Sequence, residues 1–307
     1  MSTLQRMSNQ IELRGKIADE LVEMLGDYFL ETESEHWGIA QGEIQDPYYI
    51  FGIFPDLKTA TEALQILLRE FPNLPDKFEK TIITDADWQN AYKKFVKPWN
   101  DRQLYWIPLW ERSCSEAPEG SAVVYIDAGM AFGTGAHETT RLCARRLLDY
   151  YDKYSGAISS HSLIDAGCGS GVLALSGAAL GFKNVYAFDF DPEAILVCQA
   201  NCTENAHLDP PDFAVAELSN GFKSDAQGDL ILANIHTEVL IPHSPYLVNS
   251  LKNSGTLVLS GILTKELDQV CGHYSEQFTS YRSNLNICVD SRIDGEWGDL
   301  QFTLSNA

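Results

Sequence analysis

The stretch Ser162-Leu-Ile-Asp-Ala-Gly-Cys-Gly-Ser-Gly-Val-Leu-Ala-Leu175 decides the fold of this 307-residue chain. It passes from an apolar segment through Gly167, Gly169 and Gly171 into a second apolar segment. This pattern predicts a buried strand, a tight turn and a helix. Glycines in the turn let a ligand approach backbone amides that a Cβ atom would shield. We therefore expect a nucleoside cofactor at this turn.

An acidic residue, Asp189, ends the next apolar segment and is the partner that such a cofactor needs. A carboxylate at the end of a strand can accept hydrogen bonds from both ribose hydroxyl groups. Gly169, Gly171 and Ala174 fit the GxGxx(G/A) pattern of dinucleotide sites, so spacing alone leaves NAD open. Asp165 and Gly167 extend the pattern to DxGxGxG, which resembles motif I of the class I S-adenosylmethionine-dependent methyltransferases. The longer pattern favours S-adenosylmethionine over NAD.

From about residue 121 onward, predicted strands alternate with predicted helices. This order indicates a parallel sheet with helices on both faces, an α/β fold of the Rossmann-like class. Ligands of such sheets bind at the carboxyl ends of the strands, where Asp165, Asp189 and Asn234 fall. The predicted strands are 163–165, 184–189, 230–234 and 256–259, and the predicted helices are 172–180, 193–206 and 240–251.

The amino-terminal part has a different, mixed order of elements. Helical spacing over 16–30 and 57–71 alternates with β-rich segments at 37–40, 48–54 and 78–84. We expect a small α+β domain of the split βαβ type, a common adaptor for another macromolecule. An aromatic-rich connector follows, for which we expect a helix and then a strand. The predicted domains are 1–85 for substrate recognition, 86–115 as the linker and 116–307 for cofactor binding and methyl transfer.

Composition narrows the class of partner and the compartment. The formal charge of −21 argues against wrapping nucleic acid and favours a basic partner. Seven cysteines without CxxC pairs, and an amino terminus without an apolar segment, predict a reduced cytoplasmic protein. No apolar run approaches the roughly 20 residues that span a bilayer. Cys198 and Cys202 lack further ligands nearby, so we expect no metal site. Nothing in the sequence indicates the oligomeric state.

A second motif, Ala131-Phe-Gly-Thr-Gly-Ala-His-Glu-Thr-Thr140, precedes a predicted helix that begins near Thr140. It closely resembles the AFGTGxHxTT signature of the PrmA family, the lysine methyltransferases that act on ribosomal protein eleven of the large subunit. Further segments agree in order, and the resemblance covers about residues 85–307. These segments are 165–171, Asp189-Phe-Asp-Pro192 with Asn201 and Asn205, Ala233-Asn-Ile235, Leu259-Ser-Gly-Ile-Leu263 and Gly295-Glu-Trp297.

The resemblance implies that Thr140, Gly167, Asp189 and Asn234 contact S-adenosylmethionine. Thr139 is a neighbouring candidate whose side chain could instead cap the helix. Phe132 could place its ring near the sulfonium, with core packing as the equal alternative. We interpret His137 as structural rather than as a base, and we assign no catalytic residue.

The chain also departs from the family pattern. Ala136 and Glu138 stand where the family commonly has Thr and Pro, and residues 236–239 stand where a more apolar run is usual. Residues 151–161 look like an insertion. These departures affect the recognition of the acceptor more than the binding of the cofactor. His236 could contact the substrate, or it could simply face solvent or pack.

The resemblance implies methyl transfer from S-adenosylmethionine to amino groups of a large-subunit ribosomal protein. Three alternatives stay open at the level of sequence. The same fold could methylate another protein or a small molecule. The chain could bind the cofactor and a partner without turnover, or it could be an NAD-dependent oxidoreductase.

Overall fold

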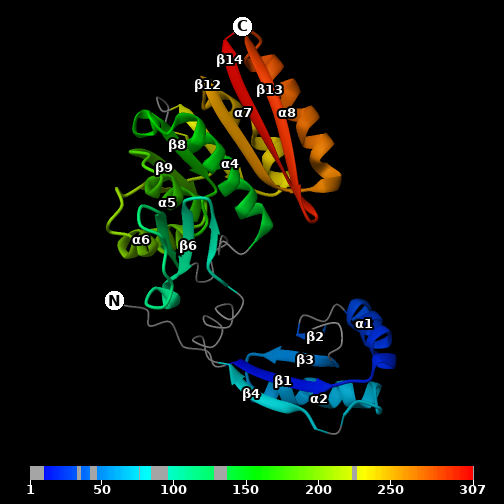
Figure 1. The fold of residues 1–307 in the computed structure, drawn as a ribbon. Coiled ribbons are helices and arrows are strands. Elements are labelled where there is room, and N and C mark those ends of the chain that lie inside the picture. The colour runs from blue at the N-terminus through cyan, green and yellow to red at the C-terminus, as the bar shows by residue number, and fades with distance from the viewer. Residues whose placement is uncertain are drawn as a thin grey trace, which may run out of the picture. The chain divides into compact units, whose positions relative to one another are not determined.

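The computed structural model describes residues 10–32, 36–41, 47–75, 77–83, 96–127, 137–222 and 227–306. The chain divides into two compact units, Met1–Lys94 and Phe95–Ala307, which are described separately (Figure 1). Within the described ranges, no helix combines the length and hydropathy needed to cross a bilayer. The predicted Phe132 lies outside these ranges.

The first unit is a four-stranded antiparallel sheet with the strand order β2-β3-β1-β4. This order, with the sequence β-α-β-β-α-β, is the predicted split βαβ sandwich. Its buried side chains include Leu13 of β1, Phe54 of β3 and Ala60 of α2. The elements are β1 (Gln10–Lys16), α1 (Val22–Glu31), β2 (Trp37–Gln41), β3 (Tyr48–Phe54), α2 (Leu57–Glu70) and β4 (Glu79–Ile83).

The start of this unit differs from the sequence-based expectation. The helix predicted over 16–30 begins only at Val22, after a short 3-10 turn (Asp19–Leu21), and β1 was not predicted. Ile11 and Leu13 are buried whereas Glu12 is half-buried and Arg14 exposed, which is the alternation of a strand with one covered face. Apolar and charged residues alternate over 11–14, so the sequence does contain the period-two pattern of such a strand.

The second unit is built on a seven-stranded sheet with the order β10-β9-β8-β11-β12-β14-β13. The first five strands are parallel, and β14 and β13 are antiparallel to their neighbours. This confirms the predicted parallel-rich sheet and adds strands that were not predicted, namely β10, β13 and β14. The strands are β8 (Ser162–Ala166), β9 (Asn184–Asp189), β10 (Asp212–Val215), β11 (Gly228–Asn234), β12 (Leu251–Leu263), β13 (Leu285–Asp294) and β14 (Trp297–Asn306).

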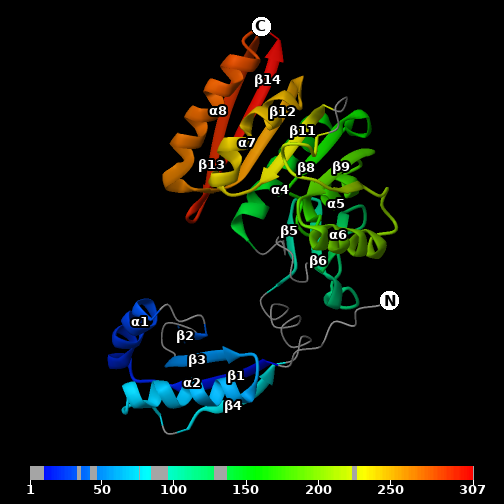
Figure 2. The same cartoon turned by 180° about the vertical axis from the view of Figure 1, so that it is seen from behind.

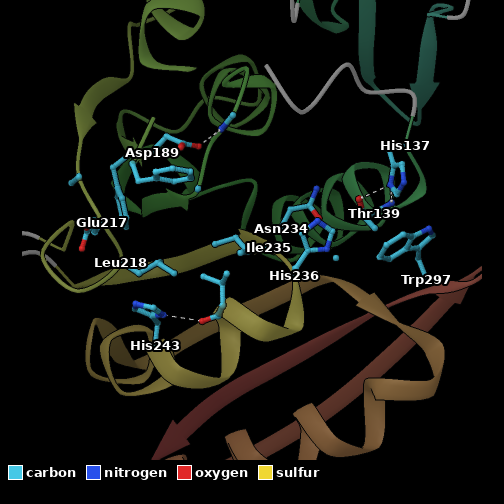
Figure 3. Close-up of a pocket in the computed structure, with 17 residues that line it drawn as sticks. His137, Thr139, Asp189, Glu217, Leu218, Asn234, Ile235, His236, His243 and Trp297 are labelled. Carbon is cyan, nitrogen blue, oxygen red and sulfur yellow. Dashed lines mark hydrogen bonds between the residues drawn. The ribbon is translucent and has the colours of Figure 1, made fainter. Parts of the chain in front are cut away.

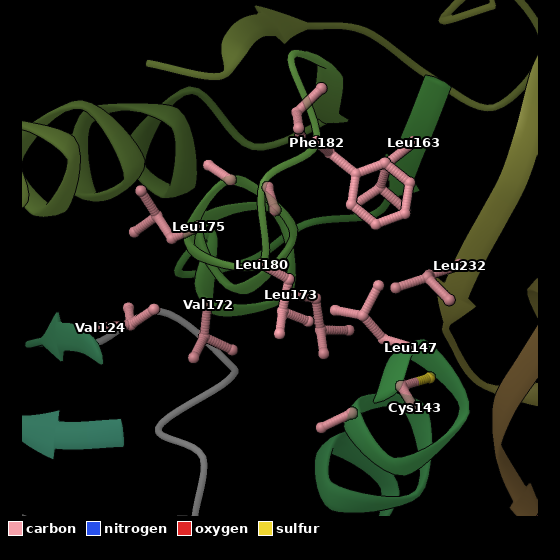
Figure 4. Packing of buried hydrophobic residues seen from close by; sticks show 14 of the residues in the cluster. Val124, Cys143, Leu147, Leu163, Val172, Leu173, Leu175, Leu180, Phe182 and Leu232 are labelled. Carbon is pink, nitrogen blue, oxygen red and sulfur yellow. The ribbon is translucent and has the colours of Figure 1, made fainter. Parts of the chain in front are cut away.

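Helices cover both faces of this sheet (Figures 1 and 2). On one face, α4 and α5 pack against buried side chains such as Leu163 and Leu232 (Figure 4). On the other, α7 and α8 pack through Leu240 and Tyr274. Burial on both faces explains why the central strands are continuous apolar runs. The helices are α4 (Glu138–Tyr154), α5 (Val172–Ala179), α6 (Pro192–Glu204), α7 (Thr237–Asn249) and α8 (Leu267–Tyr281).

A small sheet of β5 (Trp99–Asp101), β6 (Leu104–Pro108) and β7 (Ala122–Ile126) also belongs to the second unit. Residues 99–108 fall in the segment for which the sequence suggests a connector. Trp106 is buried there against Trp99, and its indole nitrogen donates a 2.7 Å hydrogen bond to Ser176 Oγ of α5. A buried tryptophan with its N–H satisfied fixes this small sheet to the helix that follows the glycine turn.

Candidate functional site

A pocket of about 650 Å³ opens at the carboxyl ends of the parallel strands, a size typical of small-molecule sites (Figure 3). Its walls come from the turn after β8, the ends of β9 and β11, the segment after β10, and the first residues of α4, α7 and β14. The lining residues are His137, Thr139, Gly167, Gly169, Phe188, Asp189, Phe190, Ala216, Glu217, Leu218, Asn234, Ile235, His236, Val239, His243, Gly261 and Trp297.

The glycine turn between β8 and α5 forms the floor of the pocket. Gly167 has φ of +72°, a conformation that side chains with a Cβ rarely adopt. A Cβ on Gly167 would also stand 2.9 Å from Ile235 Cδ1, so the turn packs directly on the end of β11. Gly167 and Cys168 both donate their backbone N–H to Phe188 O, which ties the turn to β9. Only glycine satisfies both the conformation and the close packing.

Asp165 supports the turn from below and does not line the pocket. Its Oδ2 accepts a 3.0 Å hydrogen bond from Ala174 N of α5. Burial raises the pKa of this carboxyl group to about 7, an effect that the Ala174 N–H opposes and that the charge of Asp189 reinforces. Asp165 thus joins β8 to the first turn of α5, and Asp189 is the aspartate that lines the pocket.

Asp189 presents its carboxylate at the end of β9. Its Oδ2 accepts from Gly169 N at 2.9 Å, and its Oδ1 accepts from Asp191 N at 3.0 Å. Each oxygen has a second lone pair, so the fixed carboxylate can still accept two hydroxyl groups of a ligand. Asp191 itself caps α6 by accepting from Glu193 N at 2.9 Å. The two neighbouring aspartates therefore have separate roles.

Asn234 lies where β11, β12 and α4 meet. Its Nδ2 donates to Thr140 Oγ1 at 3.2 Å, while its Oδ1 is buried and has no hydrogen-bond partner among the described residues. Thr140 does not line the pocket and reaches it only through Asn234. A buried amide oxygen without a partner is costly, so a donor from a ligand is expected there.

Gly261 allows β12 to come this close to Asn234. It has φ of +81°, and a Cβ there would stand 2.8 Å from Ile235 O. The pairing of β12 with β14 shifts register in the same place, between Leu259 and Ile262. Next to it, Ser260 Oγ donates to Thr139 O at 3.0 Å. The bulge therefore joins the ends of β11 and β12 to the start of α4.

His137 caps α4 and also lines the pocket, and the cap is in line with its interpretation as a structural residue. Its Nδ1 accepts from Thr139 N at 3.3 Å and contacts Thr139 Oγ1 at 2.8 Å. A backbone N–H can only donate, so the neutral ring carries its proton on Nε2. Thr139 is the residue that is capped, and its side chain is buried.

Several lining residues were not singled out from the sequence. Phe190 is 76% exposed although it is a large apolar residue beside Asp189, and Leu218 and Glu217 lie across the same end of the pocket (Figure 3). Trp297 and His243 line other parts of the wall. Phe190 directly follows the aspartate at the end of the strand, and this position in the sequence indicates that its ring lies near the cofactor site. The sequence indicates Trp297 only as part of a motif, because local patterns do not predict the antiparallel strand that carries it.

Three of the four predicted cofactor residues, Gly167, Asp189 and Asn234, thus line one pocket, and Thr140 bonds to the third of these. The structure also places His236 on the wall, with an exposed ring. Among the described residues, no group of three or more His, Cys, Asp or Glu side chains is arranged to hold a metal ion.

Comparison with known proteins agrees with this geometry. A family model described as ribosomal protein L11 methyltransferase (PrmA) matches residues 17–288. A ribosomal protein L11 methyltransferase of Geobacter sp. (strain M21) is 32% identical over 316 residues, which cover 95% of this chain and 97% of that protein. One from Histophilus somni (strain 2336) is 34% identical over 228 residues, 73% of each chain.

A solved structure shows the same likeness in three dimensions. The crystal structure of a ribosomal protein L11 methylase from Lactobacillus delbrueckii subsp. bulgaricus aligns with a TM-score of 0.57 and 26% identity. The alignment covers 68% of this chain and 99% of that one. Since the family model matches well over half of the chain, this protein belongs to the ribosomal protein L11 methyltransferase (PrmA) family.

Proposed function

We propose that this protein transfers methyl groups from S-adenosylmethionine to amino groups of ribosomal protein L11. The observation that carries the proposal is the pocket in which Gly167, Asp189 and Asn234 meet at three neighbouring strand ends. Family membership and relatives named for this reaction support the acceptor. Action in the cytoplasm on a basic protein, without sequence-specific contact with nucleic acid, fits the chain's net charge of −21.

The residues of the pocket suit the parts of this cofactor. Gly167 and Gly169 leave room for the amino-acid tail and the ribose near the turn. The Asp189 carboxylate, held by two backbone N–H groups, accepts the ribose hydroxyls. Phe190 and Leu218 offer apolar surfaces for the adenine ring. Asn234, positioned by Thr140, stands at the far end, and its amide oxygen has no hydrogen-bond partner among the described residues.

When bound, S-adenosylmethionine supplies a methyl group made electrophilic by its sulfonium. An acceptor amine must attack in its neutral form, although a free lysine has a pKa near 10.4. Removal from water inside the pocket favours the neutral amine. Asn234 Oδ1 can accept an amine N–H and so direct the nitrogen lone pair. Alignment of this kind can supply roughly 7–11 kcal/mol in the best cases, so no dedicated base is required.

Cofactor binding is tested by replacing Asp189. The variant Asp189→Ala should bind S-adenosylhomocysteine about 10- to 100-fold more weakly by calorimetry, since it loses hydrogen bonds to a charged acceptor. Asp191→Asn is the matched control, because an asparagine still caps α6 and should leave the affinity unchanged. Unchanged affinity in Asp189→Ala would remove the ribose assignment. Competition by NADH would favour a dinucleotide instead.

The acceptor is tested by intact-mass measurement of ribosomal proteins from undermodified ribosomes incubated with the enzyme and S-adenosylmethionine. L11 should gain about 14 Da for each methyl group, and Asp189→Ala enzyme should give none. Methylation of another protein or of a small molecule instead would be compatible with this fold but would assign the enzyme a different substrate class. Cofactor binding without any transfer would show a binding protein.

A further inference from the structure

Three aromatic rings gather at the end of the pocket opposite Asp189 (Figure 3). His137 comes from the start of α4, His236 from the residue before α7, and Trp297 is the first residue of β14. The Trp297 ring centroid lies 5.1 Å from that of His137, with planes inclined at 68°, and 6.3 Å from that of His236. Trp297 is therefore close to both imidazoles.

The two imidazole rings differ in their hydrogen bonds. His137 uses Nδ1 to cap α4, and its ring makes a T-shaped contact with Trp297. His236 occupies the corresponding capping position of α7, yet its side chain makes no capping hydrogen bond. Its ring is exposed on the pocket wall beside Asn234 (Figure 3). An N-cap residue that does not cap leaves its ring nitrogen available to a ligand.

The charged residues that line the described pocket favour a cation over an anion. Within the described part of the chain, no lysine or arginine lines the pocket, whereas Asp189 and Glu217 contribute carboxylates to its other end. Asn234 Oδ1, buried and without a described partner, accepts hydrogen bonds only. A tryptophan face attracts alkylammonium ions through its ring quadrupole. Acceptors and π surface together suit an ammonium group, whereas an anion finds no positive partner.

We propose that His236 and Trp297 form the binding wall for the acceptor amine, which becomes an alkylammonium group as the neutral nitrogen takes the methyl, so that His236 is a specificity-determining residue of this chain. This inference rests on the proposed function and names the part of the pocket that takes the substrate. Trp297 contributes its ring face, and His236 contributes a second ring edge and an acceptor nitrogen. The wall keeps its affinity when a methyl group replaces an N–H, because the positive charge and the contact with the ring remain.

The first test needs no protein substrate. Choline and its neutral isostere 3,3-dimethylbutan-1-ol are compared by saturation-transfer NMR with the full-length enzyme saturated with S-adenosylhomocysteine. Choline should bind at least threefold more tightly than the alcohol, and Trp297→Leu and His236→Leu should each reduce that preference. Tyr246→Leu is the matched control, since Tyr246 is an exposed ring on α7 outside the pocket. Equal binding of the two probes would overturn the proposal even if the enzyme methylates L11.

The second test separates the acceptor wall from the cofactor site. With L11 as substrate, Trp297→Leu and His236→Leu should raise KM for L11 about 3- to 30-fold, the range expected for losing a partly desolvated cation–π contact. Their affinity for S-adenosylhomocysteine should stay within twofold of the parent. Weaker cofactor binding with an unchanged KM would assign the rings to the cofactor and overturn the proposal. Absence of any L11 methylation by the parent enzyme would reject the proposed function. The choline comparison would still show whether His236 and Trp297 bind an alkylammonium group.

Discussion

At the residue scale, the pocket depends on two aspartates that the sequence places in similar positions. Asp165 is the last residue but one of β8 and Asp189 the last residue of β9, yet only Asp189 lines the pocket. Asp165 is buried beneath the turn, where the hydrogen bond from Ala174 N does not offset the loss of water. The pKa of Asp165 is therefore raised to about 7, close to the physiological range.

This raised pKa predicts a pH dependence of stability. An unfolded aspartate has a pKa near 3.9, so between about pH 4 and pH 7 the folded state binds more protons at Asp165. Stability from this group therefore falls as pH rises through that window. Asp165→Asn should be more stable relative to the parent at pH 8 than at pH 5, as measured by urea unfolding. An equal difference at both pH values would contradict the raised pKa.

Asp229 provides the control with the opposite sign. Burial alone would raise its pKa, but hydrogen bonds from Lys252 and Ser162 lower it. Its contribution is present above the unfolded pKa and is lost only as pH falls below about 4. Asp229→Asn should thus lose the same stability at pH 5 and at pH 8.

At the element scale, a buried ion pair joins α4 to β14, the two elements that carry His137 and Trp297. Arg146 is 1% exposed and Asp299 is fully buried. The guanidinium donates to both carboxylate oxygens of Asp299, at 2.9 and 2.6 Å, and also bonds Asp290 of β13. Burial raises the pKa of Asp299, although Arg146 opposes this. The planar fork of arginine matches the carboxylate, so lysine is not an equivalent replacement.

Breaking this pair should cost far more than removing it. Arg146→Met leaves Asp299 buried without its charge partner and should lower the free energy of unfolding by about 3–5 kcal/mol. The double variant Arg146→Met with Asp299→Leu removes both charges and should regain much of that loss. Guanidinium chloride unfolding of the three proteins measures the difference. Additive losses in the double variant would show that the two side chains do not act as a pair.

The sequence predicts elements well where one physical signal dominates. The apolar run and glycines at 162–175 specify β8, its turn and α5, because burial on both faces and the positive φ of Gly167 leave few other residues possible. By contrast, β13 is largely exposed, so its mixed polar sequence does not resemble a core strand. Trp297 is the first residue of β14, which pairs with β13 and β12. Its position beside His137 depends on the pairing of β14 with β12, which local sequence patterns do not predict.

At the scale of the whole molecule, the described residues that line the pocket all belong to the second unit. We expect a fragment of residues 95–307 to bind S-adenosylhomocysteine within threefold of the full chain, measured by calorimetry. If the first unit recognises the substrate, kcat/KM for L11 should fall at least tenfold in the same fragment. Full activity toward L11 would place substrate recognition in the second unit alone.

The net charge of −21 acts on the encounter with the substrate rather than on the fold. A ribosomal protein that binds RNA phosphates carries a basic surface, so the two proteins should attract one another at long range. Raising salt from 50 to 300 mM shortens the Debye length from roughly 14 to 6 Å and should lower kcat/KM for L11 several-fold. Cofactor affinity, which depends on short contacts in the pocket, should change less than twofold. If cofactor affinity falls in parallel with kcat/KM, salt acts on the pocket and the charge does not steer the substrate.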